Sequence, residues 1–237
     1  MILQRPKTAE QNSSYWSNLV TLLNVAHTDV KQFLDTNKEL LFNERDLQMH
    51  LATFLRLTGH YDDVDVEYYV PLSELKGYIW NNELRMDVLV RKGKEFLPIE
   101  LKYKTKIVRK KLLRFGESVA EEIEVMKNQG AQDLGKYDFW KDVRRIEIVR
   151  NRFGSIKNGL AIFVTNDPMY LQLGREKSNH IKFSMDEGSH QKEKHWLDKD
   201  SYCCKTHPDF EVEKEYSIHW DSRIIEGVQC YYTIVVI

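Results

Sequence analysis

Residues 83–103 read ELRMDVLVRKGKEFLPIELKY, a stretch that decides the fold because it predicts two β-strands joined by a tight turn. Apolar and polar side chains alternate on both sides of the sequence KGKE at residues 92–95. A two-residue turn with Gly93 in its first position is what type II′ geometry requires, and such a turn pairs Lys92 with Glu95. We therefore expect an antiparallel hairpin with a fixed register.

This register brings two acidic side chains together. Counting back from the turn places Val90 opposite Leu97 and Asp87 directly opposite Glu100. Directly opposed residues lie about 4.5–5.5 Å apart at Cβ, where like charges are destabilising. A divalent cation is the simplest offset, because hard cations such as Mg²⁺ take carboxylate oxygens and keep several waters. Lys102 follows Glu100 by two residues and so shares its face, close to any water on that metal.

The opposite face of the hairpin is expected to be buried. Its apolar series consists of Met86, Val88 and Val90 on one strand and Leu97, Ile99, Leu101 and Tyr103 on the other. A second Glu-x-Lys sequence, at residues 74–76, is flanked by Pro71 and Gly77 and fits a strand end and turn instead. The alternative of a surface hairpin with a solvated charged face stays open.

A strand Asp followed by a Glu-x-Lys strand resembles the PD-(D/E)XK nuclease superfamily, over roughly residues 43–167. The resemblance implies a restriction-endonuclease-like α/β fold, with the core order α-β-β-β-α-β and a mixed central sheet flanked by helices. It also implies cleavage of phosphodiester bonds with Mg²⁺, for which Mn²⁺ substitutes. Asp87 and Glu100 would hold the metal, and Lys102 would orient or activate the attacking water. Met86 stands where the motif often has Pro, a position that varies in the superfamily.

The segment before the hairpin supplies a further candidate residue, Glu44. Asn43 is a favourable N-cap, and an apolar stripe from Leu47 to Leu55 predicts a helix from Glu44 to about Leu57. The resemblance implies that a glutamate on this helix points into the active site, where Glu44 would bind a second metal or a water. The alternative is that Glu44 only interacts with the helix dipole, and both can be true.

A basic stretch runs out of Lys102 with no acidic residue within it. The residues that we predict to contact nucleic-acid phosphates are Lys104, Lys106, Arg109, Lys110 and Lys111, with Arg114 beyond them. The net charge is −1, so affinity for nucleic acid needs a local patch of this kind. The alternative is a solvated loop and helix start.

Periodicity predicts further elements on both sides of the hairpin. They are a helix over residues 14–34, a strand over 64–70, helices over 118–127 and 131–150, a buried strand over 159–165, and strands over 216–220 and 229–237. The two last strands add to the sheet or form a small flap on it. Residues 179–209 are polar and form a candidate mobile loop. Zinc binding there by His195, Cys203, Cys204 and His207 is disfavoured, because adjacent cysteines do not match the usual ligand spacing.

The helix over residues 131–150 also carries polar candidates. The resemblance implies that this helix presents a Gln and a Tyr to the active site, and Gln132 and Tyr137 are the available residues. Their spacing of five departs from the common spacing of four. Lys136, Arg144 and Arg145 either contact phosphates or form the solvated face of the helix, and the solvated face is favoured.

Composition sets the domain organisation and the compartment. With 237 residues and 42% hydrophobic content, the chain is expected to form a single elaborated domain. Its expected parts are an N-terminal helical segment (1–35), a nuclease-like core (36–168) and a β-rich C-terminal elaboration (169–237). The sequence has no apolar run of the ~20 residues needed to span a bilayer, and its N-terminus does not resemble a signal peptide. Three cysteines do not suggest a disulfide framework, so a cytoplasmic protein is expected.

Together these features predict a Mg²⁺-dependent endo- or exodeoxyribonuclease that acts on DNA. A homodimer or another protein partner is compatible with this function. The alternative is a catalytically silent module of the same fold that binds nucleic acid or a protein.

Overall fold

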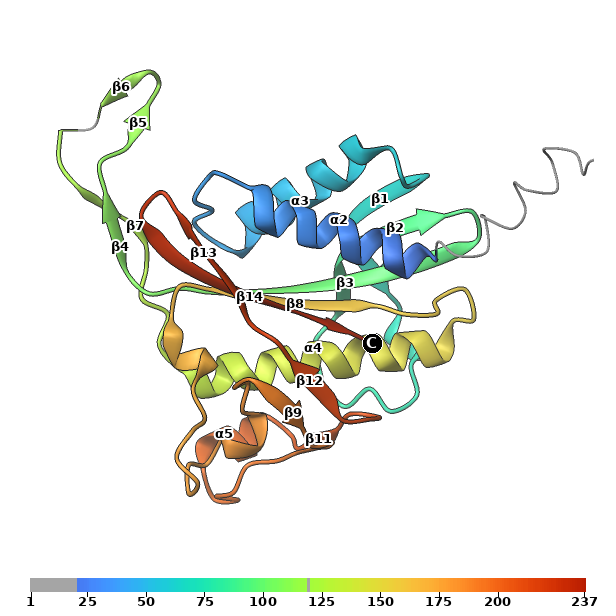
Figure 1. The fold of residues 1–237 in the computed structure, drawn as a ribbon. Coiled ribbons are helices and arrows are strands. Elements are labelled where there is room, and N and C mark those ends of the chain that lie inside the picture. Colours follow the sequence, from blue (N-terminus) through green and yellow to red (C-terminus); the bar gives the residue numbers. More distant parts are fainter. Residues whose placement is uncertain (1–20, 119) are drawn as a thin grey trace, which may run out of the picture.

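The computed structural model describes residues 21–118 and 120–237, and its centre is a six-stranded sheet (Figure 1). The strand order is β1-β2-β3-β8-β14-β13. The strands are Asp63–Val70 (β1), Leu84–Lys92 (β2), Glu95–Lys104 (β3), Leu160–Thr165 (β8), Asp221–Ile225 (β13) and Val228–Val236 (β14). β3 and β8 run parallel, and the other neighbouring pairs are antiparallel. The sheet is therefore mixed, as predicted.

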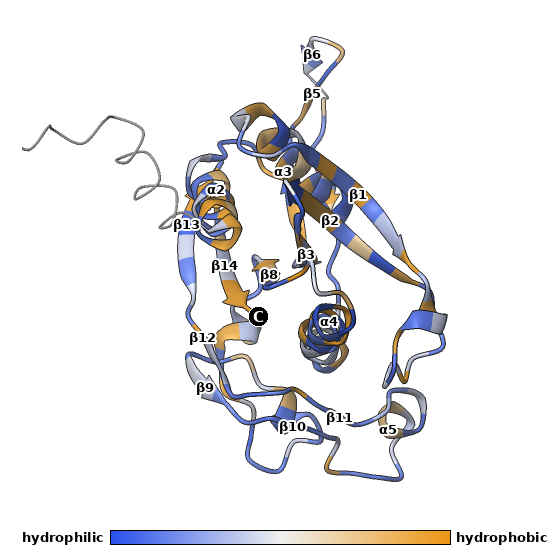
Figure 2. Cartoon of the chain, turned by 90° about the vertical axis from the view of Figure 1, so that its right-hand side faces the viewer, coloured by the Kyte–Doolittle hydropathy of each residue, from blue (hydrophilic) through white to orange (hydrophobic). Residues whose placement is uncertain are grey.

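Helices cover both faces of this sheet (Figures 1 and 2). α2 (Leu22–Thr36) and α3 (Glu44–Thr58) lie on one face, and α4 (Gln132–Arg152) lies on the other. The buried apolar side chains form two clusters, one for each face. Each helix buries an apolar stripe against the sheet, which is how a mixed α/β domain covers both faces. The predicted class, a mixed sheet flanked by helices, is confirmed.

The predicted helix before the hairpin is confirmed as α3. The Asn43 side chain accepts a hydrogen bond from the Asp46 N–H at 3.0 Å, which caps the first turn. Gly59 ends the helix with φ +68°, a conformation that glycine adopts without strain. α2 begins at Leu22, and the start predicted at Ser14 lies outside the described residues.

The predicted hairpin is also confirmed. Lys92 lies opposite Glu95, Val90 lies opposite Leu97, and Gly93 has the positive φ that the turn requires. The ladder between β2 and β3 ends where Val88 pairs with Ile99. It stops one position before Asp87 and Glu100, so β2 separates from β3 at Asp87.

β2 also changes its buried face at this point. Val88 packs in the cluster under α2 and α3 as expected, whereas Met86 packs in the cluster around α4, so the predicted face of Met86 is wrong. Glu67, the β1 residue in register with Asp87, has φ +52° and drops out of the ladder between Val66 and Tyr68. This distortion interrupts the regular alternation of side chains along the strand pair.

The segment after β3 forms an arm of short strands that projects from the body, at the upper left of Figure 1. Its strands are Val108–Lys110 (β4), Leu113–Arg114 (β5), Glu117–Ser118 (β6) and Ile123–Met126 (β7). β4 pairs with β7 and β5 pairs with β6. The helix predicted over residues 118–127 is therefore wrong in the described part of that range, because cross-strand pairing overrides the weak helical pattern.

α4 and β8 follow the prediction closely. The helix was expected over residues 131–150 and runs from Gln132 to Arg152. Gly135 lies inside it because a Cβ there would lie 2.3 Å from Tyr170 Oη. β8 is buried along nearly its whole length and ends at Thr165. Two residues later, the Asp167 side chain accepts from the Met169 N–H and caps the short helix η2 (Pro168–Leu171).

The C-terminal part completes the sheet and covers α4. β14 pairs with β8, so the last predicted strand adds to the sheet. Residues 179–209 are not a bare loop, because Phe183, Met185 and Trp196 are fully buried against α4. The small elements of this region are η3 (Ile181–Phe183), β9 (Gly188–His190), β10 (Glu193–Lys194), α5 (Tyr202–Thr206), β11 (Phe210–Glu211) and β12 (Tyr216–Ile218). A further short helix, η1 (Leu72–Glu74), follows β1. Within the described ranges no helix is long and apolar enough to cross a membrane.

Candidate active site

Because β2 separates from β3 at Asp87, the backbone N–H groups of Leu101 and Tyr103 on β3 have no hydrogen-bond partner on β2. A buried N–H needs another acceptor, and carboxylates supply it at both positions. Asp87 Oδ2 accepts from the Leu101 N–H at 2.6 Å, and Glu44 Oε2 accepts from the Tyr103 N–H at 2.9 Å. The fold therefore brings Asp87 and Glu44 to the same stretch of β3, from β2 and from the N-terminus of α3.

Lys102 lies between carboxylates from two helices. Its Nζ is 3.1 Å from Asp142 Oδ2 on α4 and 3.9 Å from Glu44 Oε2 on α3. Only 16% of the Lys102 side chain is exposed. The ammonium is thus fixed between Asp142 and Glu44 rather than extended into solvent.

α4 contributes a buried ion pair that the sequence reading missed. Arg145 Nη1 is 2.9 Å from Asp142 Oδ1, one helical turn earlier, and 3.4 Å from Glu100 Oε1. Asp142 and Glu100 are 1% and 2% exposed. The charged cluster therefore contains four carboxylates, of Glu44, Asp87, Glu100 and Asp142, and the two cations Lys102 and Arg145. Lys102 and Arg145 balance part of the repulsion that was predicted between Asp87 and Glu100.

Two oxygen atoms of this cluster keep unused hydrogen-bonding capacity. Glu100 Oε1 and Asp142 Oδ2 are buried and accept no hydrogen bond from the residues that the structure describes. Arg145 and Lys102 approach them closely enough for charge attraction. A buried oxygen without a hydrogen bond is costly, so both atoms add to the cost of burying the charged cluster.

Burial dominates the electrostatics of the two facing carboxyls. It raises the pKa of Asp87 to about 6, with the charge of Asp142 adding to the effect, while hydrogen bonds from the Glu100 carboxyl and the Leu101 N–H oppose it. Burial also raises the pKa of Glu100 well above its usual range, against the charge of Arg145 and together with that of Asp87. Burial therefore disfavours the ionised form of both carboxyls.

The charges of Asp142 and Lys102 stabilise each other. Burial opposes ionisation of Asp142, but the charges of Lys102 and Arg145 outweigh it and lower its pKa. Burial likewise opposes the charge on Lys102, and Asp142, Glu44 and Asp87 together outweigh it, so its pKa is raised. Lys102 is therefore an ammonium at neutral pH.

Gln48 is a second residue that sequence reasoning missed. Its Nε2 donates to the Asp87 carbonyl oxygen and to Glu67 Oε1, both at 2.8 Å, and so bridges the distorted part of β1 and β2. It follows Glu44 by four residues, which places both on one face of α3. That spacing was a usable signal for Gln48. Asp142 and Arg145 gave none, because charged residues on a helix are normally solvated.

Gln132 and Tyr137 do not join the cluster. Gln132 Nε2 donates to Asp167 Oδ2 at 3.0 Å, and it precedes Asp142 by ten residues, roughly 15 Å along the axis of α4. Tyr137 is buried among aromatic rings, where it accepts from Trp80 Nε1 and donates to the Pro208 carbonyl.

The solvated face predicted for the basic residues of α4 is also wrong at two positions. Lys136 is 3% exposed and Arg145 is 9% exposed. Arg144 is half-buried and pairs with Glu147 and Glu213. The C-terminal segment packs over this side of α4, which sequence periodicity alone does not reveal.

The predicted basic patch is less basic than its sequence suggests. Lys106 pairs with Asp167 at 3.1 Å, and Lys110 pairs with Glu226 at 2.6 Å. In the arm, Arg109 lies opposite Glu124 across the β4–β7 ladder. The fold brings Asp167 and Glu226 to this stretch from distant parts of the sequence. Lys104, Arg109 and Lys111 make no ion pair with the described residues and remain available for phosphate contacts.

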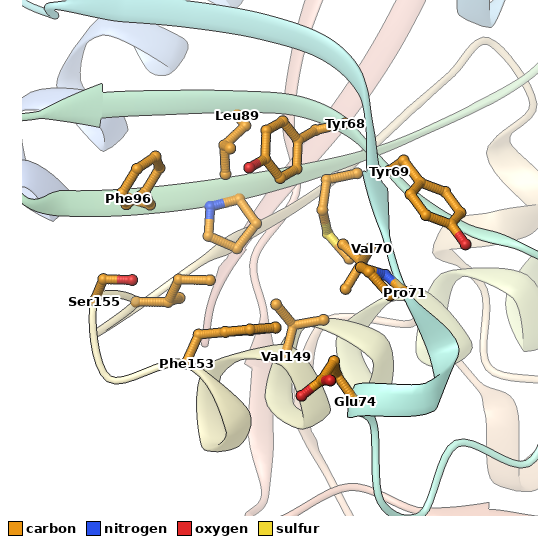
Figure 3. A pocket seen from close by; sticks show the side chains of 13 residues that line it. Tyr68, Tyr69, Val70, Pro71, Glu74, Leu89, Phe96, Val149, Phe153 and Ser155 are labelled. Carbon is orange, nitrogen blue, oxygen red and sulfur yellow. The ribbon is translucent and has the colours of Figure 1, made fainter.

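An apolar pocket of about 240 Å³ lies between β1, β2, β3 and the end of α4 (Figure 3). Aromatic and aliphatic side chains line most of it, among them Tyr68, Tyr69, Leu89, Phe96 and Phe153. No member of the charged cluster contributes to its walls, as far as the described residues go. The pocket and the charged cluster are separate features.

Within the charged cluster, Asp87 and Glu100 are the residues that could hold a hard cation. Asp87 and Glu100 offer carboxylate oxygens, and Glu100 Oε1 lacks a hydrogen bond. The Leu101 carbonyl points to the same side of β3 as its N–H, toward Asp87. The described residues contain no group of three or more His, Cys, Asp or Glu side chains arranged to hold a metal. Mg²⁺ is usually bound through one or two carboxylates and several waters.

The fold and the cluster define a mixed α/β protein with a buried charged site where two strands of its central sheet separate. No family model, curated protein or solved structure matches the chain. The argument for function therefore rests on the geometry of the site.

Proposed function

We propose that the protein is a Mg²⁺-dependent nuclease of the PD-(D/E)XK type that hydrolyses phosphodiester bonds in DNA. One observation carries the proposal: Asp87, Glu100, Lys102 and Glu44 converge where β2 separates from β3. Three elements supply these residues: α3, β2 and β3.

The order of elements supports the same reading. α3, β1, β2, β3, α4 and β8 follow one another in the chain, apart from the arm inserted between β3 and α4. This is the α-β-β-β-α-β order that the resemblance implies. The resemblance implies a site on the strand that carries the Asp and on the Glu-x-Lys strand, which correspond to β2 and β3. Fold alone does not establish activity, so the side chains decide.

Asp87, Glu100 and the Leu101 carbonyl would hold the cation. When bound, Mg²⁺ would stabilise negative charge on the phosphate and lower the pKa of a bound water. Glu100 Oε1 is buried and accepts no hydrogen bond, and the pKa values of both carboxyls are raised. Both observations support this assignment, because a bound cation would contact the oxygen and stabilise the ionised carboxylates.

Lys102 would act through its charge. An ammonium that stays protonated donates hydrogen bonds and accepts none. It would orient the attacking water or contact a phosphate oxygen, and it would not remove a proton. Asp142 and Glu44 hold the ammonium in place for that role.

A module of this fold that binds without cutting is the second candidate. The observation that favours it is Arg145, whose guanidinium partly neutralises Glu100 without any metal. The two candidates differ in whether a metal ion is needed, and a cleavage assay separates them.

The test is cleavage of linear, circular and single-stranded DNA, and of RNA, with Mg²⁺ or Mn²⁺. Wild type is compared with Glu100→Gln and with Glu95→Gln, which changes an exposed glutamate on the same strand. We expect metal-dependent products from wild type and Glu95→Gln and none from Glu100→Gln. Products that persist in Glu100→Gln would refute the assignment. Binding of DNA without cleavage by wild type would favour the non-cutting module.

A further inference from the structure

Two lysines are buried on one face of α4 without a carboxylate partner. Lys136 on α4 is 3% exposed, and Lys194 on β10 is 1% exposed. The Lys194 ammonium lies 3.6 Å from the centre of the Trp140 ring, and Trp140 follows Lys136 by four residues on the same face of the helix. Lys136 donates one long hydrogen bond, of 3.5 Å, to the Gln172 carbonyl oxygen. Among the described residues, neither lysine has an ion pair.

This arrangement is unfavourable for a protein that holds nothing else there. A buried ammonium is stable only when it is paired with negative charge. Burial lowers the pKa of Lys194 to about 7 and also lowers the pKa of Lys136. The contact with Trp140 offsets roughly 2 kcal/mol of this cost at most. An apolar side chain would fill the position of Lys194 at lower cost, so the lysine calls for another reason.

A pocket of about 370 Å³ lies at this place, in the C-terminal layer that Figure 2 shows beneath α4. Its buried lining residues are Ser184, His190 and Lys194, and its other lining residues are half-buried or exposed. Two carboxylates also line it. Glu176 is exposed at the rim, and half-buried Asp186 already accepts a hydrogen bond from Ser184 Oγ at 2.5 Å. The floor of the pocket is therefore basic and its acidic groups lie further out.

His190 adds to the basic character of this floor. Its Nε2 donates to the Asp186 carbonyl oxygen at 2.8 Å, which leaves Nδ1 for another partner. Its ring centre lies 5.5 Å from that of Trp140, the ring that Lys194 also contacts. Burial lowers the pKa of His190, and the charges of Lys194 and Lys136 lower it further, against the hydrogen bond and charge of Asp186. Three basic groups thus act on one another around one wall of the pocket.

We propose that this pocket binds the phosphate group of a small-molecule ligand, held by Lys194 and His190. The charge of a phosphate dianion equals that of the two buried lysines, whereas a carboxylate would balance only one. The Lys194 ammonium has three N–H donors, and a protonated His190 donates through Nδ1. Lys136 is not part of the lining and acts through its charge alone. Lys182 and Gln191 supply further donors at the rim.

The inference stands apart from the proposed nuclease. The pocket shares no lining residue with the charged cluster between β2 and β3, as far as the described chain goes. Its volume is in the range of sites for small organic molecules, so it accommodates a phosphate that carries a small organic group as well as the free ion. The free ion and the ester have the same anionic chemistry, and the test separates them.

The test is calorimetric titration of the full-length protein, at fixed ionic strength, with inorganic phosphate, adenosine monophosphate or acetate. Wild type is compared with Lys194→Met, His190→Gln and Lys192→Met. Lys192 is an exposed lysine two residues before Lys194 and serves as the matched control. Circular dichroism establishes that each variant is folded. Lys194→Met removes a buried charge, and Gln keeps an N–H donor for the Asp186 carbonyl, so both variants are expected to fold.

We expect wild type to bind one phosphate group per chain and to bind acetate far more weakly. Lys194→Met should lower the affinity roughly tenfold or more, because a hydrogen-bonded charge pair is lost. His190→Gln should lower it by a smaller factor, and Lys192→Met should leave it unchanged. Tighter binding of inorganic phosphate than of adenosine monophosphate would identify the free ion as the ligand, and the reverse order would identify an ester.

Four results would overturn the inference. Folded wild type that binds neither phosphate compound saturably would remove the site. Equal affinity in folded Lys194→Met would remove the role of Lys194. An equal loss in Lys192→Met would reduce the effect to general surface charge, and acetate bound as tightly as phosphate would refute the ligand class. Each of these outcomes leaves the nuclease proposal untouched, because none of the three substituted residues belongs to the charged cluster.

Discussion

Replacing Asp87 with Asn should stabilise the metal-free protein. The raised pKa of Asp87, about 6 against an ordinary 3.8, means that the folded state disfavours the ionised carboxylate. A difference of about two pKa units corresponds to roughly 3 kcal/mol at pH values above both. Asn removes the charge and keeps an oxygen that accepts from the Leu101 N–H. We therefore expect the free energy of unfolding at pH 8 to rise by about 2–3 kcal/mol.

The pH dependence of this gain has a defined sign. Below pH 4, Asp87 is protonated in the folded and unfolded states, so the wild-type residue carries no penalty. As the pH rises from about 4 to 6, the unfolded chain loses its proton first and the folded wild type is destabilised. The advantage of Asp87→Asn should thus be complete above pH 6 and shrink as the pH falls toward 4.

Urea unfolding with a chelator present, at several pH values between 4.5 and 8, measures this gain. Asp65→Asn is a matched control, since Asp65 is a partly exposed aspartate on the neighbouring strand. At pH 8 the melting temperature of Asp87→Asn should be higher by roughly 5–10 °C. Adding Mg²⁺ should raise the stability of wild type but not of Asp87→Asn, because a ligand stabilises only a folded state that binds it.

The reasoning would be refuted by an Asp87→Asn protein that is less stable than wild type at pH 8 in chelator. That result would mean that Asp87 contributes a net favourable charge interaction, and that Lys102 and Arg145 already satisfy the cluster. A gain that is independent of pH would also refute it, because the gain would then not come from ionisation.

Three further predictions concern other parts of the molecule. Lys194 is 1% exposed, burial lowers its pKa to about 7, and its ammonium lies 3.6 Å from the Trp140 ring centre. The free energy of unfolding of wild type should therefore rise between pH 7 and 10, because only the folded state has lost this proton in that range. In urea unfolding, Lys194→Met should remove this pH dependence and raise the free energy of unfolding at pH 7 by about 2–4 kcal/mol. Gly135→Ala should lose about 1–3 kcal/mol in urea unfolding, despite the better helix propensity of Ala, because the new Cβ meets Tyr170 Oη. Replacing Arg109 and Lys111 together with Ala should lower the slope of log affinity against log salt by about two in DNA-binding anisotropy, one for each lost phosphate contact.

The parts of the fold that sequence predicted are those that local chemistry specifies. Gly93 fixes the turn, and the turn fixes the register from Lys92–Glu95 to Val88–Ile99. Asn43 and Gly59 bound α3 in the same local way. These features need no knowledge of the rest of the chain.

The parts that sequence missed depend on contacts between distant residues. The separation of β2 from β3 coincides with a backbone distortion at Glu67, a residue type that gives no warning of positive φ. Asp142 and Arg145 resemble a surface ion pair in sequence and become buried only because α4 packs on β3 and the C-terminal segment packs on α4. The arm was expected to be partly helical because its strands are too short to show alternation.

The choice of side chains at the separated strands argues for function over stability. The Leu101 and Tyr103 N–H groups need acceptors, and the amide oxygens of Asn and Gln would serve as well as carboxylates. Carboxylates instead place like charges together in a buried site, where Asp87 alone costs roughly 3 kcal/mol without a further cation. A chain shaped only by stability would avoid that cost, whereas a chain that binds a cation recovers it on binding. The stability of Asp87→Asn in chelator and its indifference to Mg²⁺ therefore test the function as well as the electrostatics.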